Sequence, residues 1–390
     1  MRIVVVGAGI GGLAAALGLG AAGHQVEVYE RGDRLRTEGN GVILWPGATG
    51  ILDALGIRVA ELGPAMHRGE LLTSDGSLLV WTDMREVSAR YGQDTLLVSR
   101  GRVVEVLGAA LPAGTVRFGR RCTEVRHRAD GATVVFSDGT EVDADVVIGA
   151  DGYRSAVRSR TLGDAPRFTG VATWHGTGPL RSDLAGGHTV RTYFGRIGIC
   201  AVHPVGDGLL HWAFEGPWSP GDEAEGRAAG PQLPRLRGWF GGWAPEVTGL
   251  LDQVTEEDVH VFPHALHRVP RRWGQGAVTL MGDAAHAIPP RAGMGANQAL
   301  EDAWVLAGAL RDVREPRLAD AALRAYESAR VRRVRRVRNG AAWMSRSNNM
   351  LLMLRALRVA VPMNRLAHAS VAGGSNYLNS HRPKPVTTSS

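Results

Sequence analysis

The chain begins with a short apolar run that passes directly into glycines. Residues 2–6 (RIVVV) are almost wholly apolar, a pattern typical of a strand buried on both faces of a sheet. A helix is expected from about Gly11 to Ala22, ending near Gly23, and a second strand from Val26 to Tyr29. The order strand, helix, strand predicts a βαβ unit at the start of the chain.

Two later segments show the same pattern of a buried strand that ends in a charged or glycine turn. They are Asp145–Ala150 (DVVIGA) and Ala277–Met281 (AVTLM). Because fully apolar strands are typical of parallel sheets, we expect both segments to join the N-terminal strands in one sheet.

The pattern alternates elsewhere, which indicates antiparallel strands with one buried face. Residues 133–150 alternate around Asp138-Gly139, a strong hairpin signal, and a second alternating region runs from about Val171 to Phe262. From Ala296 the apolar spacing is helical to about Arg311, and again from about Leu318 to Arg346.

Composition is that of an ordinary globular protein. With 390 residues, 44% of them hydrophobic and 21% charged, the chain can bury one large core or two smaller ones. The two cysteines, Cys122 and Cys200, are far apart and lack metal-ligand spacing, so neither a disulfide framework nor a metal site is expected. A reducing cytoplasm is the expected location.

Membrane segments are not expected. The N-terminal apolar run lacks the length and cleavage site of a secretory signal. The apolar stretch at Met350-Leu-Leu-Met is interrupted by Arg355, Arg358 and Pro362, so it falls short of the roughly 18 apolar residues of a spanning helix, although it could touch a membrane surface.

The net charge of +7 is concentrated in one basic run, Arg330–Arg338 (RVRRVRRVR). Val331, Val334 and Val337 are spaced three apart, which indicates an amphipathic helix with a solvated basic face. Attraction of anions or lipids is an alternative. Nucleic acid is not an expected partner, because no aromatic platform or base-reading motif accompanies the run.

The glycine turn after the first strand matches a dinucleotide fingerprint. Gly7, Gly9 and Gly12, with Ile10 between the last two, form GxGxxG between a buried strand and the helix expected from about Gly11, and Glu30 follows about 20 residues later. Such glycines permit a tight turn and close approach of backbone amides to a pyrophosphate, which the helix N-terminus attracts. Glu30 is then placed to accept hydrogen bonds from a ribose.

A second motif follows the strand at 277–281. Gly282-Asp283-Ala-Ala-His286 precedes Pro290, Gly293-Met294-Gly295-Ala296-Asn297 and Asp302. This order resembles the GDAAHxxxPxxGxGxNxxxxDA motif of single-component FAD-dependent aromatic hydroxylases, the para-hydroxybenzoate hydroxylase-like family. The resemblance implies that Asp283 binds the ribityl chain of FAD. It also implies that Gly282, Pro290 and the turn Gly293–Asn297 contact the flavin, with the helix N-terminus near Ala296 stabilising its reduced, anionic form.

Other segments extend the resemblance from Met1 to about Arg346. VVIGADGYRSAVR, ending at Arg158, resembles the family's DG motif, with Asp151, Ser155 and Arg158 at matching places. Arg100 looks like the family's flavin-contacting arginine, Val125 stands where a backbone contact to adenine is usual, and Arg31 follows the ribose-binding Glu30. Two positions depart from the pattern: Glu38–Val42 lacks the arginine that some members place on a mobile flavin, and Met294 replaces a common glutamine.

These features predict an α/β fold with an α+β insert, in which a Rossmann-like FAD-binding domain of discontinuous segments is interleaved with an antiparallel-sheet substrate domain and followed by C-terminal helices. The expected FAD-binding segments are residues 1–72, 97–165 and 272–346. The substrate domain takes residues 73–96 and 166–271, and residues 347–390 form a C-terminal helix and flexible tail.

The resemblance implies an FAD-dependent monooxygenase. Hydride transfer from NADH or NADPH to FAD, addition of O2 at C4a, and attack of an aromatic or polycyclic substrate on the C4a-hydroperoxyflavin would follow. No second GxGxxG stands in a strand-helix context, so NAD(P)H is expected to dock transiently. The enzyme is expected to be a monomer or homodimer.

Candidate catalytic residues lie in the alternating region, where a substrate must be held and water excluded. We expect His211, His175 or His203 to act as a base, Tyr193 to contact the substrate, and Pro290 to stiffen the wall where oxygen adds. The wider pool is Trp174, Phe194 and Trp212.

Three alternatives remain at this stage. The first is a flavoenzyme of the same fold with another outcome, such as a reductase, an epoxidase or a halogenase, although the halogenase segment WxWxIP is absent. An NAD-dependent dehydrogenase would explain Gly7 to Glu30 but not Gly282 to Asn297. A non-catalytic nucleotide-binding sensor is the third.

Overall fold

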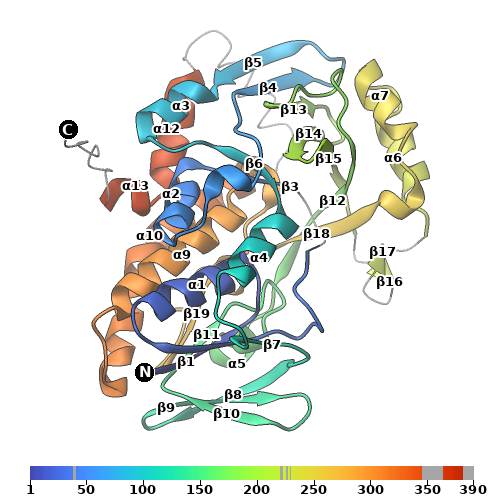
Figure 1. Ribbon diagram of the computed structural model, residues 1–390. Coiled ribbons are helices and arrows are strands. Elements are labelled where there is room, and N and C mark those ends of the chain that lie inside the picture. Colours follow the sequence, from blue (N-terminus) through green and yellow to red (C-terminus); the bar gives the residue numbers. More distant parts are fainter. Residues whose placement is uncertain (38–40, 220–222, 225–226, 229, 345–362, 381–390) are drawn as a thin grey trace, which may run out of the picture.

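The computed structural model describes residues 1–37, 41–219, 223–224, 227–228, 230–344 and 363–380. The chain forms two sheet-centred layers, one near each end of the molecule in Figure 1, with long helices packed along one side. The apolar stretch at 350–362, residues 38–40 and the end of the predicted tail lie outside the described residues. Within the described part of the chain, no helix is long and apolar enough to cross a membrane.

A parallel sheet with strand order β19-β11-β1-β2-β7 carries the N-terminus. Its strands are β1 (Arg2–Val6), β2 (Gln25–Tyr29), β7 (Val116–Arg117), β11 (Val146–Gly149) and β19 (Val278–Leu280). Every neighbouring pair is parallel, so the predicted strands at 2–6, 145–150 and 277–281 do meet in one sheet. The helix α1 (Ile10–Ala21) connects β1 to β2 and confirms the βαβ unit.

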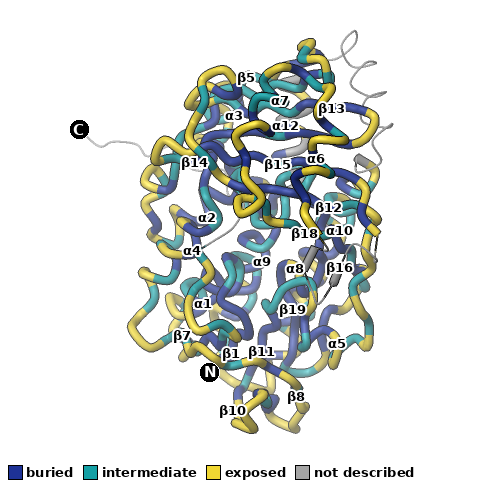
Figure 2. Tube along the Cα trace, turned by 90° about the vertical axis from the view of Figure 1, so that its right-hand side faces the viewer, coloured by how far each residue is buried: buried dark blue, intermediate teal, exposed yellow. Residues whose placement is uncertain are grey.

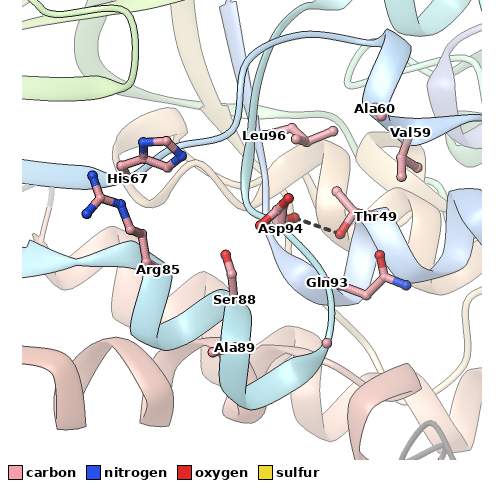
Figure 3. A pocket seen from close by; sticks show the side chains of 11 residues that line it. Thr49, Val59, Ala60, His67, Arg85, Ser88, Ala89, Gln93, Asp94 and Leu96 are labelled. Atoms are coloured by element: carbon pink, nitrogen blue, oxygen red, sulfur yellow. Dashed lines mark hydrogen bonds between the residues drawn. The ribbon is translucent and has the colours of Figure 1, made fainter. Parts of the chain in front are cut away.

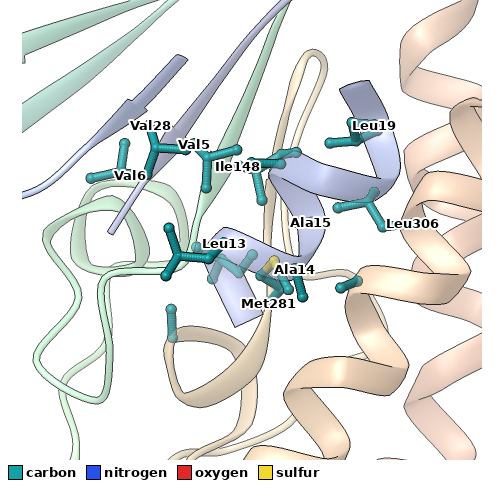
Figure 4. Close-up of a cluster of buried hydrophobic side chains, with 14 of the residues drawn as sticks. Val5, Val6, Leu13, Ala14, Ala15, Leu19, Val28, Ile148, Met281 and Leu306 are labelled. Carbon is teal, nitrogen blue, oxygen red and sulfur yellow. The ribbon is translucent and has the colours of Figure 1, made fainter. Parts of the chain in front are cut away.

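The helix α1 is held between this sheet and α9 (Gly295–Leu310). Leu13, Ala14 and Leu19 are buried against the sheet and the neighbouring helix (Figure 4). The two helices approach closely at Gly18, where an added Cβ would lie 2.9 Å from the Cβ of Ala307. Small residues thus let the N-terminal helix and α9 lie side by side.

A three-stranded antiparallel sheet caps the lower end of the molecule in Figure 1. It consists of β8 (Cys122–Arg128), β9 (Gly131–Phe136) and β10 (Glu141–Ala144). The turn between β9 and β10 holds Asp138 and Gly139, whose φ is +80°, which confirms the predicted hairpin. The helix α5 (Ala156–Leu162) packs beside this sheet.

A seven-stranded sheet with order β18-β12-β15-β14-β13-β4-β5 forms the other layer. Its strands are β4 (Arg68–Thr73), β5 (Leu78–Asp83), β12 (Arg167–Pro179), β13 (Thr189–Phe194), β14 (Ile199–Gly206), β15 (Leu209–Pro217) and β18 (His260–Leu266). The predicted boundary after residue 72 is corrected here. Because β4 pairs with β13 from Arg68 onward, residues 68–72 belong to the second sheet.

Two helices, α6 (Leu233–Phe240) and α7 (Pro245–Leu251), cover one face of the seven-stranded sheet (Figure 1). Leu236, Phe240 and Val247 from these helices are buried against it. The alternating pattern over 171–262 did not reveal these helices, which begin at Pro-containing turns within it. The opposite face turns toward the parallel-sheet domain.

Shorter elements join the two layers. They are β3 (Gly41–Leu44), β6 (Leu96–Ser99), α2 (Pro46–Ala54), α3 (Met84–Tyr91), α4 (Arg100–Ala109), α8 (Gly282–His286), β16 (Glu223–Ala224), β17 (Arg227–Ala228) and the 3-10 turns at Val59–Glu61, Glu256–Asp258, Pro290–Ala292 and Pro316–Leu318. The pair β3–β6 is a small antiparallel sheet that contacts β14. In Figure 2 the strands of both layers are mostly buried, and exposure concentrates in the connecting loops.

The C-terminal helices are α10 (Ala319–Met344), α12 (Met363–Gly374) and α13 (Tyr377–Ser380). The expected solvated face of Arg330–Arg338 is only partly correct. Arg332 and Arg336 are exposed, but Arg330 is fully buried and donates to Asp302 Oδ1 at 2.6 Å. Arg330 therefore pairs with the buried carboxylate of Asp302 on α9 and does not belong to the solvated basic face.

Candidate functional site

The glycine turn after β1 has no room for a side chain at Gly7 or Gly12. Gly7 has φ of +109°, and a Cβ there would collide with the backbone of Ala150 at the end of β11. A Cβ on Gly12 would collide with the carbonyl oxygen of Gly7. These glycines therefore let strand, turn and helix close tightly, as the fingerprint requires.

The N-terminus of α1 is open to an anion. Gly9 is the N-cap and makes no side-chain cap, while Ile10 begins the helix and is buried. The backbone N–H of Leu13 bonds to the Gly9 carbonyl, so the amides of the first turn point out of the helix without intrahelical partners. A pyrophosphate suits this position, because the helix dipole and the free amides both favour negative charge.

Glu30 and Arg100 lie on either side of the glycine turn. The Glu30 carboxylate accepts the backbone N–H of Ala8 at 2.9 Å and of Gly32 at 3.0 Å, and Arg31 is exposed beyond it. The Arg100 guanidinium lies 4.0 Å from the place of a Gly9 Cβ. Burial lowers the pKa of Arg100, while the charges of Asp283 and Glu30 act to raise it. Arg100 thus lies within electrostatic reach of both motifs.

Asp283 stands at the start of the short helix α8 with an exposed side chain. Although the side chain reaches the surface, the protein packed around it raises the pKa of Asp283, and the charges of His286 and Arg100 oppose this rise. Gly282, with φ of +54°, places its backbone N–H on Asp302 Oδ2 at 2.8 Å. The turn therefore presents Asp283 outward while its own backbone is fixed inward.

Two buried arginines hold α8 and α9 in place. Arg158 donates to the carbonyls of Ala284 at 2.9 Å and Ala285 at 2.8 Å, and its other nitrogens bond to Asp164. On the other side, Asp302 accepts from Arg330 and lies 2.6 Å from His286 Nε2. Burial alone would raise the pKa of Asp302, but the charges of His286 and Arg330 outweigh burial and lower it.

Asp151 stabilises the start of the helix α5. Its carboxylate accepts the hydroxyl of Ser155 at 2.5 Å and the backbone N–H of Ala156 at 2.7 Å, so it caps the start of α5. The expected contact of Asp151 with FAD remains a prediction. Val125 lies on β8 with its side chain buried, and its expected backbone contact to adenine likewise remains a prediction.

The turn from Pro290 to Asn297 reaches toward β3. The Asn297 amide donates to the carbonyls of Gly293 at 2.7 Å and Ile43 at 2.8 Å, and its oxygen accepts the backbone N–H of Trp45 at 2.8 Å. Gly293 has φ of +56°, and Met294 is the N-cap of α9 without a side-chain bond. Gly295 and Ala296 begin a helix whose first amides are again open to negative charge.

These residues fit a dinucleotide. Two helix N-termini lack side-chain caps, Arg100 lies between the two motifs, and a Cβ at Gly7 or Gly12 would collide with the backbone of the turn. Among the described residues, no group of three or more His, Cys, Asp or Glu side chains is arranged to hold a metal ion. The site is therefore suited to an anionic organic cofactor.

The residues expected to contact the substrate lie on opposite faces of the seven-stranded sheet. Register pairs place His203 opposite His211, and His175 opposite Ala213, on the face that meets β3. Tyr193 lies opposite Cys200 on the other face, under α6 and α7, in the same apolar cluster as Trp174 and Trp212. We therefore correct the expectation for Tyr193, because strand alternation turns it away from the glycine and Asp283 motifs.

The three histidines are buried close together. Ring centroids lie 4.8 Å apart for His203 and His211, and 5.8 Å apart for His175 and His211. Burial lowers the pKa of His175 and of His203 to about 4 and lowers that of His211 further below its ordinary value. Burial disfavours the charged form of each ring. A neutral imidazole can accept a proton or a hydrogen bond, so the expected role of a histidine base stays a prediction.

An ion pair that the sequence did not reveal joins the two layers. Arg291, next to Pro290, donates to Glu215 on β15 at 2.5 Å, and both side chains are at most 5% exposed. Glu215 shares a face with His211 because four residues separate them on one strand. This parity, together with the position of Arg291 after Pro290, is the signal that would have indicated the pair.

A separate cavity lies away from the two motifs. It has a volume of about 410 Å³ and lies between α2, α3 and the loop before β6, where Thr49 bonds to the backbone of Asp94 and where His67 and Arg85 sit at one end (Figure 3). None of the predicted cofactor or catalytic residues lines it. The candidate site is therefore defined by the two motifs and not by this cavity.

Comparisons with known proteins point to the same cofactor. A family model described as FAD binding domain matches residues 1–341. A 3-amino-4-hydroxybenzoate 2-monooxygenase of Streptomyces platensis is 36% identical over 345 residues, covering 86% of this chain and 85% of that protein. An FAD-dependent urate hydroxylase of Klebsiella pneumoniae is 32% identical over 343 residues, covering 86% and 87%. The crystal structure of Klebsiella pneumoniae HpxO with FAD and uric acid superposes with a TM-score of 0.86 at 28% identity, covering 97% of each chain.

Proposed function

The chain belongs to the FAD-binding family of class A aromatic hydroxylases and is an oxidoreductase, and from this premise we propose that it uses NAD(P)H and O2 to hydroxylate an aromatic or polycyclic small molecule. One observation supports the proposal above the others. Arg100 lies against Gly9 of the first motif and within electrostatic reach of Asp283 of the second, although these residues are far apart in sequence.

When bound, FAD would supply the redox chemistry, which is acceptance of electrons from NAD(P)H and activation of O2. The first turn of α1 would bind its pyrophosphate, Glu30 a ribose and Asp283 the ribityl hydroxyls. The start of α9 would stabilise negative charge on the reduced ring system through its dipole, and no titrating group is needed there. Pro290 and Asn297 would fix the turn that forms this wall.

The sheet domain supplies the substrate side. On the face that carries the three histidines, the row of His203 and His211 is covered by β3, which Asn297 ties to the flavin-binding turn. A covered face excludes water from the reacting atoms and holds the substrate in one orientation. The carbon to be oxygenated would therefore lie between this face and the turn at Pro290–Asn297.

The decisive experiment uses the purified full chain. We expect a yellow protein with flavin absorbance near 450 nm, NAD(P)H oxidation that an aromatic substrate accelerates, and a product heavier by one oxygen atom. A colourless protein, or flavin reduction that no aromatic compound accelerates, would refute the proposed function. Exchange of NADH for NADPH in the same assay identifies the electron donor.

A variant locates the cofactor site. Asp283→Ala removes the carboxylate assigned to the ribityl chain, so we expect its affinity for FAD to fall about tenfold, as for one lost charge-assisted hydrogen bond. Fluorescence titration of the apoprotein with FAD measures this change. Asp312→Ala, on an exposed loop after α9, is the control and should leave the affinity unchanged.

A further inference from the structure

One strip of the inner sheet face is left open. Thr192, Ala201 and Ala213 are register partners in a row across β13, β14 and β15, and each is partly exposed. The rows on either side are buried, with Phe194 and Glu215 on one side and His203 and His211 on the other. Two alanines in the middle of the row give a flat floor, which suits a planar ring.

The histidine side of this strip has hydrogen-bonding atoms without partners. His203 is 6% exposed and His211 is 4% exposed, yet His203 Nε2 and both ring nitrogens of His211 make no hydrogen bond to any of the described residues. His175 Nδ1, next to the floor, is also unpaired. Buried polar atoms are rarely left unsatisfied, so a ligand that both donates and accepts hydrogen bonds suits this edge.

The packing of β3 fixes these rings. A Cβ on Gly41 would collide with His203 and would lie 2.7 Å from the His211 ring, so only glycine fits above them. The same strand is tied through Ile43 to Asn297 at the start of α9. The unpaired nitrogens therefore belong to a part of the fold that is continuous with the flavin-binding turn.

The strip carries no net charge among the described residues. Glu215 and Arg291, the charged groups that face it, neutralise each other in their buried ion pair. Burial favours the uncharged form of each histidine that borders the floor. An ionised carboxylate placed here would lose its water and meet neutral imidazoles and an already compensated arginine, which is costly.

We propose, on the basis of the proposed function, that the substrate is a planar aromatic or heteroaromatic molecule without formal charge, whose hydroxyl, ring N–H or ring carbonyl bonds to His203 and His211. The ring lies on Ala201 and Ala213. The same edge discriminates against aromatic carboxylic acids, so the substrate class differs in charge from the aminohydroxybenzoate named for the Streptomyces relative.

The test measures binding to the oxidised holoenzyme, by the change in flavin absorbance near 450 nm. Two matched pairs differ by one carboxylate: 2-aminophenol with 3-amino-4-hydroxybenzoate, and 4-hydroxyquinoline with its 2-carboxylate. We expect the uncharged member of at least one pair to bind tenfold or more tightly than its acid. His203→Leu and His211→Leu should each weaken that binding about tenfold, whereas His211→Asn should restore part of it. His127→Leu, an exposed histidine on β8, is the matched control.

Three results would overturn the substrate assignment: tighter or equal binding of the acids, failure of both uncharged compounds to bind a fully flavinated enzyme, or unchanged binding in both leucine variants. If the acids bind and are hydroxylated, the substrate class is wrong and the monooxygenase function stands. If the uncharged compounds bind as expected but never accelerate NAD(P)H oxidation, the substrate class stands and the oxygenase function fails.

Discussion

At the scale of single residues, the carboxylates near the cofactor motifs differ in whether the protein already supplies their hydrogen-bond partners. Asp151 and Asp302 are ionisable groups near the cofactor motifs, and each is already bonded to backbone amides or to a partner side chain. Asp283 extends outward from α8, and its carboxylate makes no hydrogen bond to the part of the chain that the structure describes. Proximity to a motif in sequence thus does not separate a cofactor ligand from a structural cap, whereas the hydrogen-bond partners do.

The buried histidines predict an acid-sensitive stability. In the folded protein the pKa of His175 and of His203 is about 4, below the ordinary value of 6.5, so between these values the unfolded chain binds protons that the folded chain does not. Stability therefore falls as the pH drops from 6.5 toward 4, by on the order of 1 to 2 kcal/mol per histidine at pH 5. Thermal unfolding of the holoenzyme at pH 7 and pH 5 measures this loss.

Non-titrating variants isolate the histidine contribution from that of the carboxylates. His203→Asn should shrink the difference between the unfolding temperatures at pH 7 and pH 5. His127→Asn, on an exposed position of β8, should leave the difference as in the parent protein. Equal shrinkage in both variants would contradict a special role for the buried ring.

At the scale of elements, the short helix α8 depends on neighbours for its position. It has five residues and no side-chain cap, so little of its stability is its own. Arg158 from α5 binds the carbonyls near its C-terminal end, and Asp302 from α9 binds its first backbone N–H. The orientation of Asp283 is therefore set by two other helices.

Removal of the α5 anchor should affect both stability and cofactor binding. Arg158→Met leaves the buried Ala284 and Ala285 carbonyls and the Asp164 carboxylate without their donor. We expect a loss of about 3 to 5 kcal/mol in the free energy of unfolding, as for one broken buried ion pair. Urea denaturation with a parallel FAD titration measures both effects.

Arg160→Met on the same helix is the control, because Arg160 is exposed and should contribute little. Addition of Asp164→Asn to Arg158→Met removes the unpaired charge and should recover part of the stability. If Arg158→Met unfolds like the parent and binds FAD with parent affinity, the anchoring role is disproved.

The sequence predicted well those elements whose causes are local. The strand at 2–6, the glycine turn and the hairpin at Asp138-Gly139 each follow from a few adjacent residues, and the structure confirms them. Burial of Arg330 was missed because its carboxylate partner, Asp302, lies 28 residues away on another helix. Valine spacing alone cannot reveal that contact.

The substrate face was harder to predict for a related reason. His211 and Tyr193 both lie in alternating strands, but which alternate set faces the cofactor depends on the register between strands. Register is fixed by packing under α6 and α7, and the alternation does not reveal these helices. The histidines therefore could be named from sequence, whereas their separation from Tyr193 could not.

At the scale of the whole molecule, the Glu215–Arg291 pair connects the substrate sheet to the turn beside Pro290. Both side chains of this pair are at most 5% exposed, so the pair is almost completely shielded from solvent. A buried pair contributes little net stability but is costly to break. It therefore fixes the relative position of floor and flavin-binding turn.

Breaking this pair should reduce both stability and coupling. Glu215→Gln leaves the Arg291 charge buried without a carboxylate, and we expect a loss of about 3 to 5 kcal/mol in unfolding free energy. Substrate-stimulated NAD(P)H oxidation should then yield more H2O2 for each product formed, because the site closes less well against water. Calorimetry and peroxide assays measure the two effects.

The exposed pair between Arg317 and Glu315 offers the comparison. Glu315→Gln should change stability by less than about 0.5 kcal/mol and leave peroxide formation as it was. The double variant Glu215→Gln with Arg291→Met should regain part of the lost stability. Peroxide yields that match the parent enzyme in Glu215→Gln would show that the pair does not seal the site.

The parallel sheet draws three neighbouring strands from distant parts of the chain: Val147 on β11 pairs with Val4 on β1 and with Val278 on β19. During synthesis, the glycine turn leaves the ribosome early, but β19 is made only after more than half of the chain. The sheet around the turn cannot be completed before then. Folding is correspondingly non-local and slow. A nascent chain that ends before Gly282 contains the fingerprint loop but lacks Asp283. We therefore expect the vitamin-derived cofactor to be retained only late in translation.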